Sequence, residues 1–404
     1  MKEKVGEDRQ RSGFFGKLVL RAVDSDRKVM FLTAGVIMAM MALFSWPVVP
    51  HLWDEMSVAT GLRPPSGMFP GLWRGILSGL YSALPASAVN MTLRIMGLVA
   101  AGILSMLSFA IFDASLPDVL RVQLRGISRG RMIARWCLAG GTFLFMCNEV
   151  VWRACQSFGS LTFEILIGMA ALWLVLGFFH EDGYWRLYLA MVIWGVVAGE
   201  SAIGHVFAIA SVVAVFRKAL TNRDEAENPI GNPLMRRLVI GKMLRIYLLV
   251  VLLTVLADYW LYVMLGGKTA SKSLPANVAV ICLGGYWDQM LGAMSWSGWL
   301  LAFVFVLAPF VVALLLLKKA LTDDKFIALP YAAAYLVLGV LAWSQCAGLS
   351  GLWFRSWFSY RLINDDFLVV VLAVLGIVTL LWAVTVFCRI YYYRSIRHIA
   401  GEQF

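Results

Sequence analysis

The chain has 404 residues, of which 61% are hydrophobic and only 15% are charged, and its formal net charge is +11. Soluble domains average about 45–50% apolar and about 25% charged residues, so this chain holds more apolar side chains than one soluble core could bury. The apolar residues fall in continuous runs of roughly 18–22 residues, the length of a bilayer-spanning helix, and not in the short alternating segments of a barrel. Only helices and closed barrels satisfy their backbone hydrogen bonds in lipid. We therefore expect an all-α integral membrane protein.

The apolar runs predict about ten membrane-spanning helices. In chain order they are expected at 29–48, 94–112, 136–152, 161–179, 187–200, 201–216, 246–265, 297–317, 326–346 and 367–388. Residues 71–84, which follow Pro70, are only weakly amphipathic and contain glycines. We expect this stretch to form a helix lying in the interface at the outer face, rather than an eleventh crossing.

The charges between the spans orient the chain in the membrane. With the N-terminus inside, 27 of the 35 Lys and Arg residues fall on the cytoplasmic side and eight on the outer side. Cytoplasmic loops of membrane proteins carry such an excess, so both termini are predicted to be cytoplasmic. The distribution also explains the net charge without nucleic acid, which we do not expect as a partner. The expected surroundings are the lipids of a bacterial inner (plasma) membrane.

The predicted spans divide the chain into five parts. These are a basic cytoplasmic segment at 1–28, a membrane module at 29–217 with an outer loop at 48–93, a cytoplasmic loop at 218–245, a set of transmembrane helices at 246–388 and a cytoplasmic tail at 389–404. Two Asn-Pro pairs interrupt the cytoplasmic loop, and a residue before proline is biased away from helical geometry.

Charged residues at the membrane edge are the candidates for function, because a charge in lipid is costly unless it is paired or used. Most of them fall at one depth, the outer surface. They are Asp54, Glu55, Glu149, Arg153, Glu200 and His205. The alternative is that they form local ion pairs that stabilise helix ends. Glu149 and Arg153, which are four residues apart on one predicted helix, could neutralise each other in this way.

The loop after the first span carries a resemblance to a known family. The run Trp53-Asp54-Glu55, followed by Arg63-Pro64-Pro65-Ser66-Gly67 and Pro70, resembles the first outer loop of GT-C superfamily glycosyltransferases. These enzymes span the membrane many times and use sugars linked to polyprenyl phosphate. The closer likeness is to the bacterial family related to transmembrane protein O-mannosyltransferases.

A second stretch supports this resemblance. In that family a tryptophan-containing third helix is followed by a short outer turn, and then by a helix with a glycine-rich end and a histidine. Here the corresponding residues are Trp152, Gly195, Gly199 and His205. The resemblance covers about half of the chain, roughly residues 30–217, and its motifs are moderately specific.

The resemblance implies roles for the candidate residues. Sugar transfer needs a base for the acceptor hydroxyl, and a carboxylate in a partly desolvated outer cavity, Asp54 or Glu55, suits that task. Positive charge is needed against the departing phosphate, and arginine binds phosphate through a planar fork. The expected substrate-binding residues are Arg63, Arg74, Glu149, Arg153, Glu200 and His205.

The sequence does not identify a cofactor. A divalent cation such as Mg or Mn between a carboxylate and the donor phosphate is compatible with the chemistry, but four scattered histidines supply no dedicated metal site. Two other functions stay open. A lipid flippase or transporter is disfavoured by the lack of an inverted repeat. A catalytically silent membrane scaffold predicts that Asp54 can be replaced without consequence.

Overall fold

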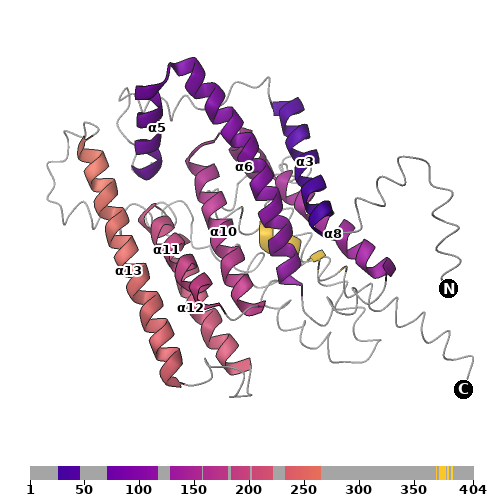
Figure 1. Ribbon diagram of the computed structural model, residues 1–404, viewed down its shortest axis with the longest axis vertical. Coiled ribbons are helices and arrows are strands. Elements are labelled where there is room, and N and C mark those ends of the chain that lie inside the picture. Colours follow the sequence, from indigo (N-terminus) through magenta and orange to yellow (C-terminus); the bar gives the residue numbers. More distant parts are fainter. Residues whose placement is uncertain are drawn as a thin grey trace, which may run out of the picture.

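The computed structural model describes residues 26–45, 71–116, 128–156, 158–180, 183–200, 203–221 and 233–264, together with several positions between 370 and 384. Every regular element in these ranges is an α-helix, and the ranges contain no strand (Figure 1). The helices are α3 (Asp26–Ser45), α5 (Gly71–Ala83), α6 (Ala86–Ser115), α8 (Ser128–Met146), α9 (Glu149–Gln156), α10 (Ser160–His180), α11 (Tyr184–Glu200), α12 (Ile203–Thr221) and α13 (Pro233–Met264). The predicted all-α class is therefore confirmed for the described residues.

Four helices of the described part are long and apolar enough to cross a membrane. Their apolar spans are Asp26–Phe44, Ser87–Ser115, Leu161–Phe178 and Pro233–Ala257. Two further apolar helices are shorter, at Met132–Met146 and Tyr184–Ala198. Large apolar side chains are also exposed along whole helix faces, as at Leu248, Leu249 and Leu252 of α13. Such helices and faces are those of a membrane protein.

Two contacts show how the helix ends are placed. Arg135 Nε lies 2.6 Å from Asp26 Oδ1, which joins the start of α3 to the first half of α8. The Phe158 backbone N–H donates to the Leu93 carbonyl at 2.9 Å, which joins the turn before α10 to the first third of α6. We name the two ends of the bundle the Asp26 end and the Phe158 end. Figure 1 shows α3, α6, α8, α10, α11, α12 and α13 running alternately between these ends, as successive membrane crossings do.

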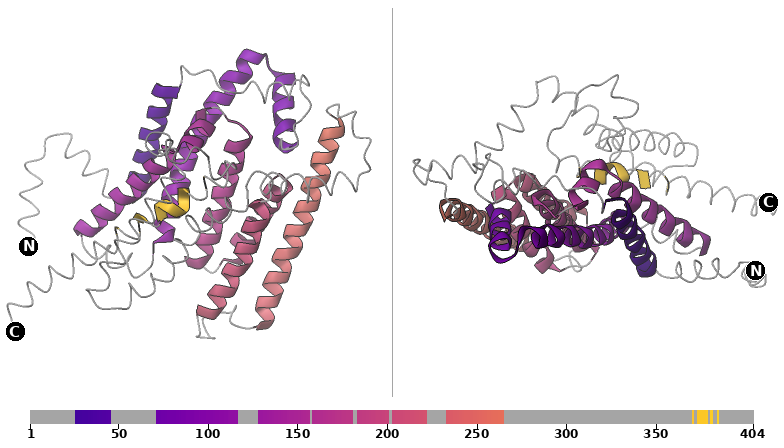
Figure 2. Two further views of the ribbon diagram at one scale, coloured as in Figure 1. Left: turned by 180° about the vertical axis from the view of Figure 1, so that it is seen from behind. Right: turned by 90° about the horizontal axis from the view of Figure 1, so that it is seen from above.

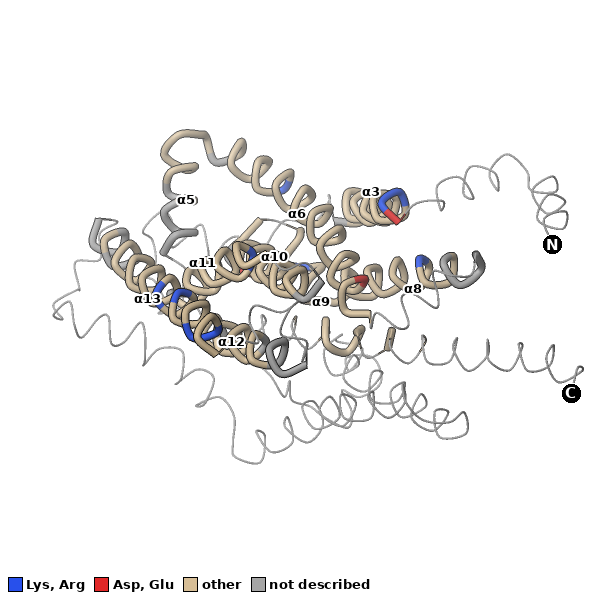
Figure 3. The backbone as a smooth tube through the Cα atoms, turned by 60° about the horizontal axis from the view of Figure 1, so that its bottom comes forward, with Lys and Arg blue, Asp and Glu red and all other residues tan. Residues whose placement is uncertain are grey.

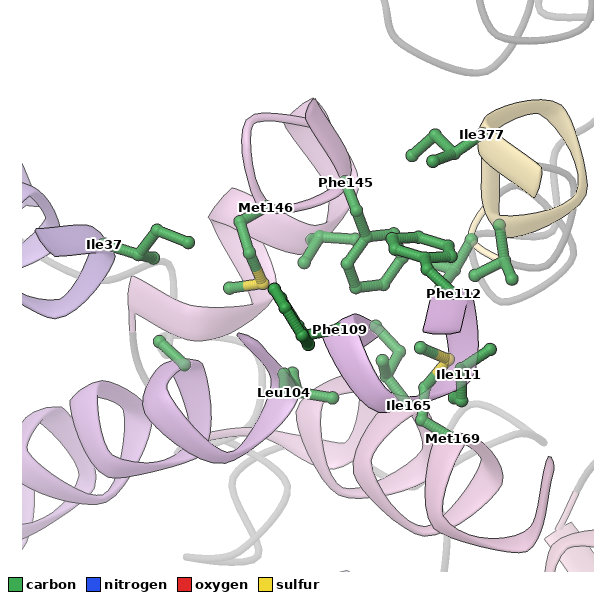
Figure 4. Close-up of a cluster of buried hydrophobic side chains, with 14 of the residues drawn as sticks. Ile37, Leu104, Phe109, Ile111, Phe112, Phe145, Met146, Ile165, Met169 and Ile377 are labelled. Atoms are coloured by element: carbon green, nitrogen blue, oxygen red, sulfur yellow. The ribbon is translucent and has the colours of Figure 1, made fainter. Parts of the chain in front are cut away.

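Two apolar cores hold the described bundle together. The first lies among α3, α6, α8, α9 and α10 and includes positions of the 370–384 segment (Figure 4). In its centre Phe112 and Phe145 pack edge to face, with ring centroids 6.3 Å apart. The second lies among α10, α11, α12 and α13. Because lipid is as apolar as these side chains, such cores stabilise the bundle mainly through close packing.

The third predicted span differs from the structure, because it is two helices rather than one. The expected helix at 136–152 is broken after Met146, and α9 starts at Glu149. Asn148, which is fully buried, caps the new helix: its Oδ1 accepts from the Val150 N–H at 2.9 Å. Asparagine is among the strongest helix-capping residues. A hydropathy reading joins α8 and α9 because apolar residues continue on both sides of the cap.

Part of the predicted cytoplasmic loop at 218–245 is helical, because α13 begins at Pro233 and not near 246. Proline is favoured at the first helical position, where its missing N–H costs no hydrogen bond. The basic residues after this proline therefore form the first turns of a 32-residue helix.

Helix α5 matches its expected range and shows what covers its apolar face. Leu77 is buried with Val89 and Leu93 of α6, and α5 also packs against α13. Figures 1 and 2 show α5 and α6 as the two arms of a hairpin at the Phe158 end. The apolar face of α5 therefore meets protein, and not only the membrane interface that the sequence suggested.

The remaining predicted spans, at 297–317 and 326–346, and most of the span at 367–388 lie outside the described residues.

Candidate functional site

A polar pair lies where α11, α12 and α13 meet. The Tyr247 hydroxyl of α13 hydrogen-bonds Nδ1 of His205, which stands near the start of α12. The two rings are almost perpendicular, at 82°, with centroids 6.0 Å apart. Tyr247 is buried and His205 half-buried. With the hydroxyl as donor, the neutral imidazole carries its proton on Nε2, so His205 offers one N–H to a further partner.

Two glycines bring the three helices together at this pair. A Cβ on Gly195 would lie 2.8 Å from Val250 Cβ and 3.2 Å from the Tyr247 carbonyl oxygen, so α11 and α13 touch here. A Cβ on Gly204 would overlap the backbone of Ala198, so α12 starts directly against α11. Small residues allow such close approach between membrane helices. The glycines thus set the distance between the backbones that carry His205 and Tyr247.

A stacked aromatic pair lies beside these helices. The rings of Trp194 and Phe207 are 4.7 Å apart and nearly parallel, at 12°. Trp194 is fully buried, yet its Nε1 finds no acceptor among the described residues. Buried polar atoms without a partner are rare and require an explanation. We name His205, Tyr247, Trp194 and Gly195 the α11–α13 junction.

Apart from His205, the candidate residues of the predicted outer site fall in three groups: those outside the described residues, those on α5 and α11, and those on α9. Asp54, Glu55 and Arg63 lie outside the described residues. Arg74 is in the first turn of α5 and Glu200 is the last residue of α11, and both are placed by their backbone alone. Helix α5 packs against α13, and α13 also packs against α11 and α12.

Glu149 and Arg153 lie on a different element. Glu149 is the first residue of α9, and Arg153 is an exposed residue one helical turn later. Helix α9 packs on α6, α8 and α10. The elements that carry the described candidates all reach the Phe158 end, but from two sides of α10. The pairing of Glu149 with Arg153 stays a prediction.

Sequence reasoning missed Tyr247 and Trp194. Tyr247 lies within a long apolar run and its contact with His205 spans 42 residues, so no local spacing links them. A weaker signal is available in the sequence: Tyr247 lies near the start of the span expected at 246–265, and a tyrosine buried there needs a partner for its hydroxyl.

A metal site is not visible in the described ranges. No group of three or more His, Cys, Asp or Glu residues there could hold a metal ion. Asp54 and Glu55, the carboxylates expected to hold Mg or Mn, lie outside those ranges.

Comparison with known proteins adds no relative: no family model, no curated protein and no solved structure matches this chain. The function must therefore be argued from the residues.

Proposed function

We propose that the protein is a membrane glycosyltransferase of GT-C type, which moves a sugar from a polyprenyl-phosphate donor to an acceptor at the outer face of a bacterial inner membrane. The observation that carries the proposal is the position of α5. Residues Asp54, Glu55 and Arg63 precede α5 in the chain, and α5 packs against α13, the helix that carries Tyr247 (Figure 1). This packing supports a site formed jointly by the α5 region and the α11–α13 junction.

The proposal includes about ten crossings with both termini in the cytoplasm. The alternating helix directions support successive crossings, and the charge distribution supports this orientation. The Phe158 end is then the outer end. Four described helices meet the length and hydropathy of a span, and the other crossings follow from the apolar runs.

In this mechanism the carboxylate of Asp54 takes the proton from the acceptor hydroxyl. The acceptor oxygen attacks the anomeric carbon of the sugar while the bond from that carbon to the phosphate oxygen breaks. Polyprenyl phosphate leaves with the bonding electrons, and Arg63 and Arg74 stabilise its charge. Glu55 orients the loop or the acceptor.

The junction supplies fixed hydrogen-bond donors for a polar substrate. The Nε2–H of His205 is oriented by Tyr247, and Trp194 Nε1 has no acceptor in the described part. A donor held before the substrate arrives costs no reorganisation during the reaction. We place the sugar or the acceptor against these atoms, with Glu200 at the adjoining turn and Glu149 and Arg153 at the far side of α10.

The experiment replaces Asp54 by Asn, which keeps the size and removes the basicity. Purified protein is given labelled polyprenyl-phosphate mannose or polyprenyl-phosphate glucose, and label in non-lipid products is measured. We expect transfer to fall by about 10²-fold or more in the Asn variant. Glu55→Gln is the parallel variant. Full transfer by both variants would contradict carboxylate catalysis, and no transfer by the wild type from either donor would favour the silent scaffold.

A further inference from the structure

A second feature lies toward the Asp26 end, where α13 carries a group of cations. Lys242 and Arg245 are exposed and three residues apart, so they share one face of the helix. The Lys242 Nζ lies 4.5 Å from the ring centroid of Tyr188 on α11. Figure 3 shows the blue positions gathered on this part of α13, beside α12. We name Lys242, Arg245 and Tyr188 the α13 basic patch.

The patch has no anionic partner in the described part of the chain. Neither Lys242 nor Arg245 forms an ion pair with a described carboxylate, whereas Arg135 pairs with Asp26 at the same end. Further cations stand nearby: Arg236 lies 5.5 Å over the Phe216 ring, and Arg237 is exposed. Like charges gathered without counter-charges attract an anion.

The length of α13 places the patch at headgroup depth. Its 32 residues make a helix about 48 Å long, whereas the hydrocarbon core of a bilayer is about 30 Å thick. The apolar span of α13 starts at Pro233, but its first half holds Arg236, Arg237, Lys242 and Arg245, whereas residues 246–264 hold no Lys or Arg. This second part alone is about 28 Å long and can fill the core. Lys242 and Arg245 then lie just outside the hydrocarbon, at the level of lipid phosphates.

The neighbouring surface is suited to acyl chains. The turns that follow the patch expose Leu248, Leu249 and Leu252, with Leu248 63% exposed. At the adjoining start of α11, Trp185 is 58% exposed, as tryptophans are at membrane interfaces. If the phosphate of a phospholipid lay between the two cations, the acyl chains of that lipid would pack against these leucines.

We propose that the α13 basic patch is a binding site for an anionic phospholipid, with the lipid phosphate between Lys242 and Arg245. A free phosphate ion carries negative charge as well, but it has no acyl chains to pack against the exposed leucines. The patch adjoins the α11–α13 junction on its Asp26 side, since Arg245 precedes Tyr247 by two residues, and it does not include the proposed catalytic residues Asp54 and Glu55.

The test measures lipid binding to the purified protein in neutral detergent. Phosphatidylglycerol, phosphatidylcholine with the same acyl chains, and inorganic phosphate are titrated separately, and bound lipid is counted by native mass spectrometry. We expect phosphatidylglycerol to bind in preference to the other two. Each cation near an anionic surface contributes about fivefold, so Lys242→Gln with Arg245→Gln should weaken phosphatidylglycerol binding roughly 25-fold.

The matched control removes two charges from the same end of the molecule but from another helix. Arg27 and Lys28 are exposed at the start of α3, and Arg27→Gln with Lys28→Gln should leave the affinity within about twofold. Lys242→Arg with Arg245→Lys keeps both charges and should retain binding. Equal losses in the two Gln pairs would overturn the site and leave only diffuse attraction. Equal binding of phosphatidylcholine, or equal binding of inorganic phosphate, would also overturn it. Asp54→Asn should not change lipid binding, so this test is independent of the transferase proposal.

Discussion

The two halves of the described bundle are packed in different ways. Around α6 and α8 the core is made of large apolar side chains such as Phe112, Phe145 and Met146, and the helices meet through these chains. Around α11 and α13 the backbones themselves approach, at Gly195 and Gly204. The half-buried His205, its buried partner Tyr247 and the buried Trp194 lie in this second half, whereas the buried polar groups of the first half are smaller side chains such as Thr142 and Asn148.

The difference separates two tasks. A core of large interlocking side chains fixes the helices mainly through close packing. Close backbones with a few oriented polar atoms hold those atoms in set positions, which is what a binding site requires. The half that holds α11 to α13 is therefore where we place the substrate, and the other half supports it. The comparison can be tested by substitutions in each half.

The largest effect is expected in the large-residue core. Phe112→Ala removes a fully buried ring that packs against Phe145, and it should lower the free energy of unfolding by about 3 kcal/mol or more through the cavity it leaves. Phe143, which is 37% exposed on α8, is the matched control. Its Ala variant should cost less than about 1 kcal/mol. Thermal unfolding in detergent measures both, and equal losses would mean that this core is not closely packed.

An intermediate effect is expected at the glycine contact. Gly195→Ala adds a Cβ 2.8 Å from Val250 Cβ, so the helices must move apart at a cost of about 1–3 kcal/mol. Gly140→Ala is the control, since no atom lies within 4 Å of its added Cβ. Alanine is the better helix former, so this variant should be neutral or more stable. Should both variants unfold at the same temperature, α11 and α13 do not touch as described.

The smallest effect concerns the polar pair. Tyr247→Phe removes only the hydroxyl, and the loss of its hydrogen bond to His205 should cost about 0.5–1.5 kcal/mol. Tyr188→Phe removes a hydroxyl from the neighbouring helix while keeping the ring that faces Lys242, and it should change stability by less than about 0.5 kcal/mol. Transfer activity sharpens the test, because an oriented His205 predicts a loss in Tyr247→Phe alone.

The sequence predicted helices well where hydropathy and helix coincide. The span expected at 161–179 is α10, at Ser160–His180, and the first span differs from α3 by three residues at each end. Hydropathy does not predict a helix boundary that is set by a capping hydrogen bond or by a proline. Asn148 ends a helix by capping the next one inside an apolar run, and Pro233 starts a helix whose first turns are too basic to be read as a span.

The site was predicted only in part, for a related reason. Charges at a membrane edge are visible in a sequence because they are rare there, which is how His205 and Glu200 were found. The partner of His205 is a tyrosine far along the chain, and its role depends on how α11, α12 and α13 pack. No periodicity within one helix encodes that contact.

The most direct test of the central claim is the binding of the donor lipid. Polyprenyl phosphate is added to the detergent-purified protein, and the melting temperature is measured for the wild type, Arg63→Ala and the Lys242→Gln, Arg245→Gln pair. A ligand of the folded state raises its melting temperature. We predict a rise for the wild type and for the α13 pair, and a smaller rise for Arg63→Ala, whose lost contact is worth about 1.5–3 kcal/mol of binding. No rise at saturating polyprenyl phosphate, or an unchanged rise in Arg63→Ala, would contradict the donor mechanism and favour a membrane scaffold.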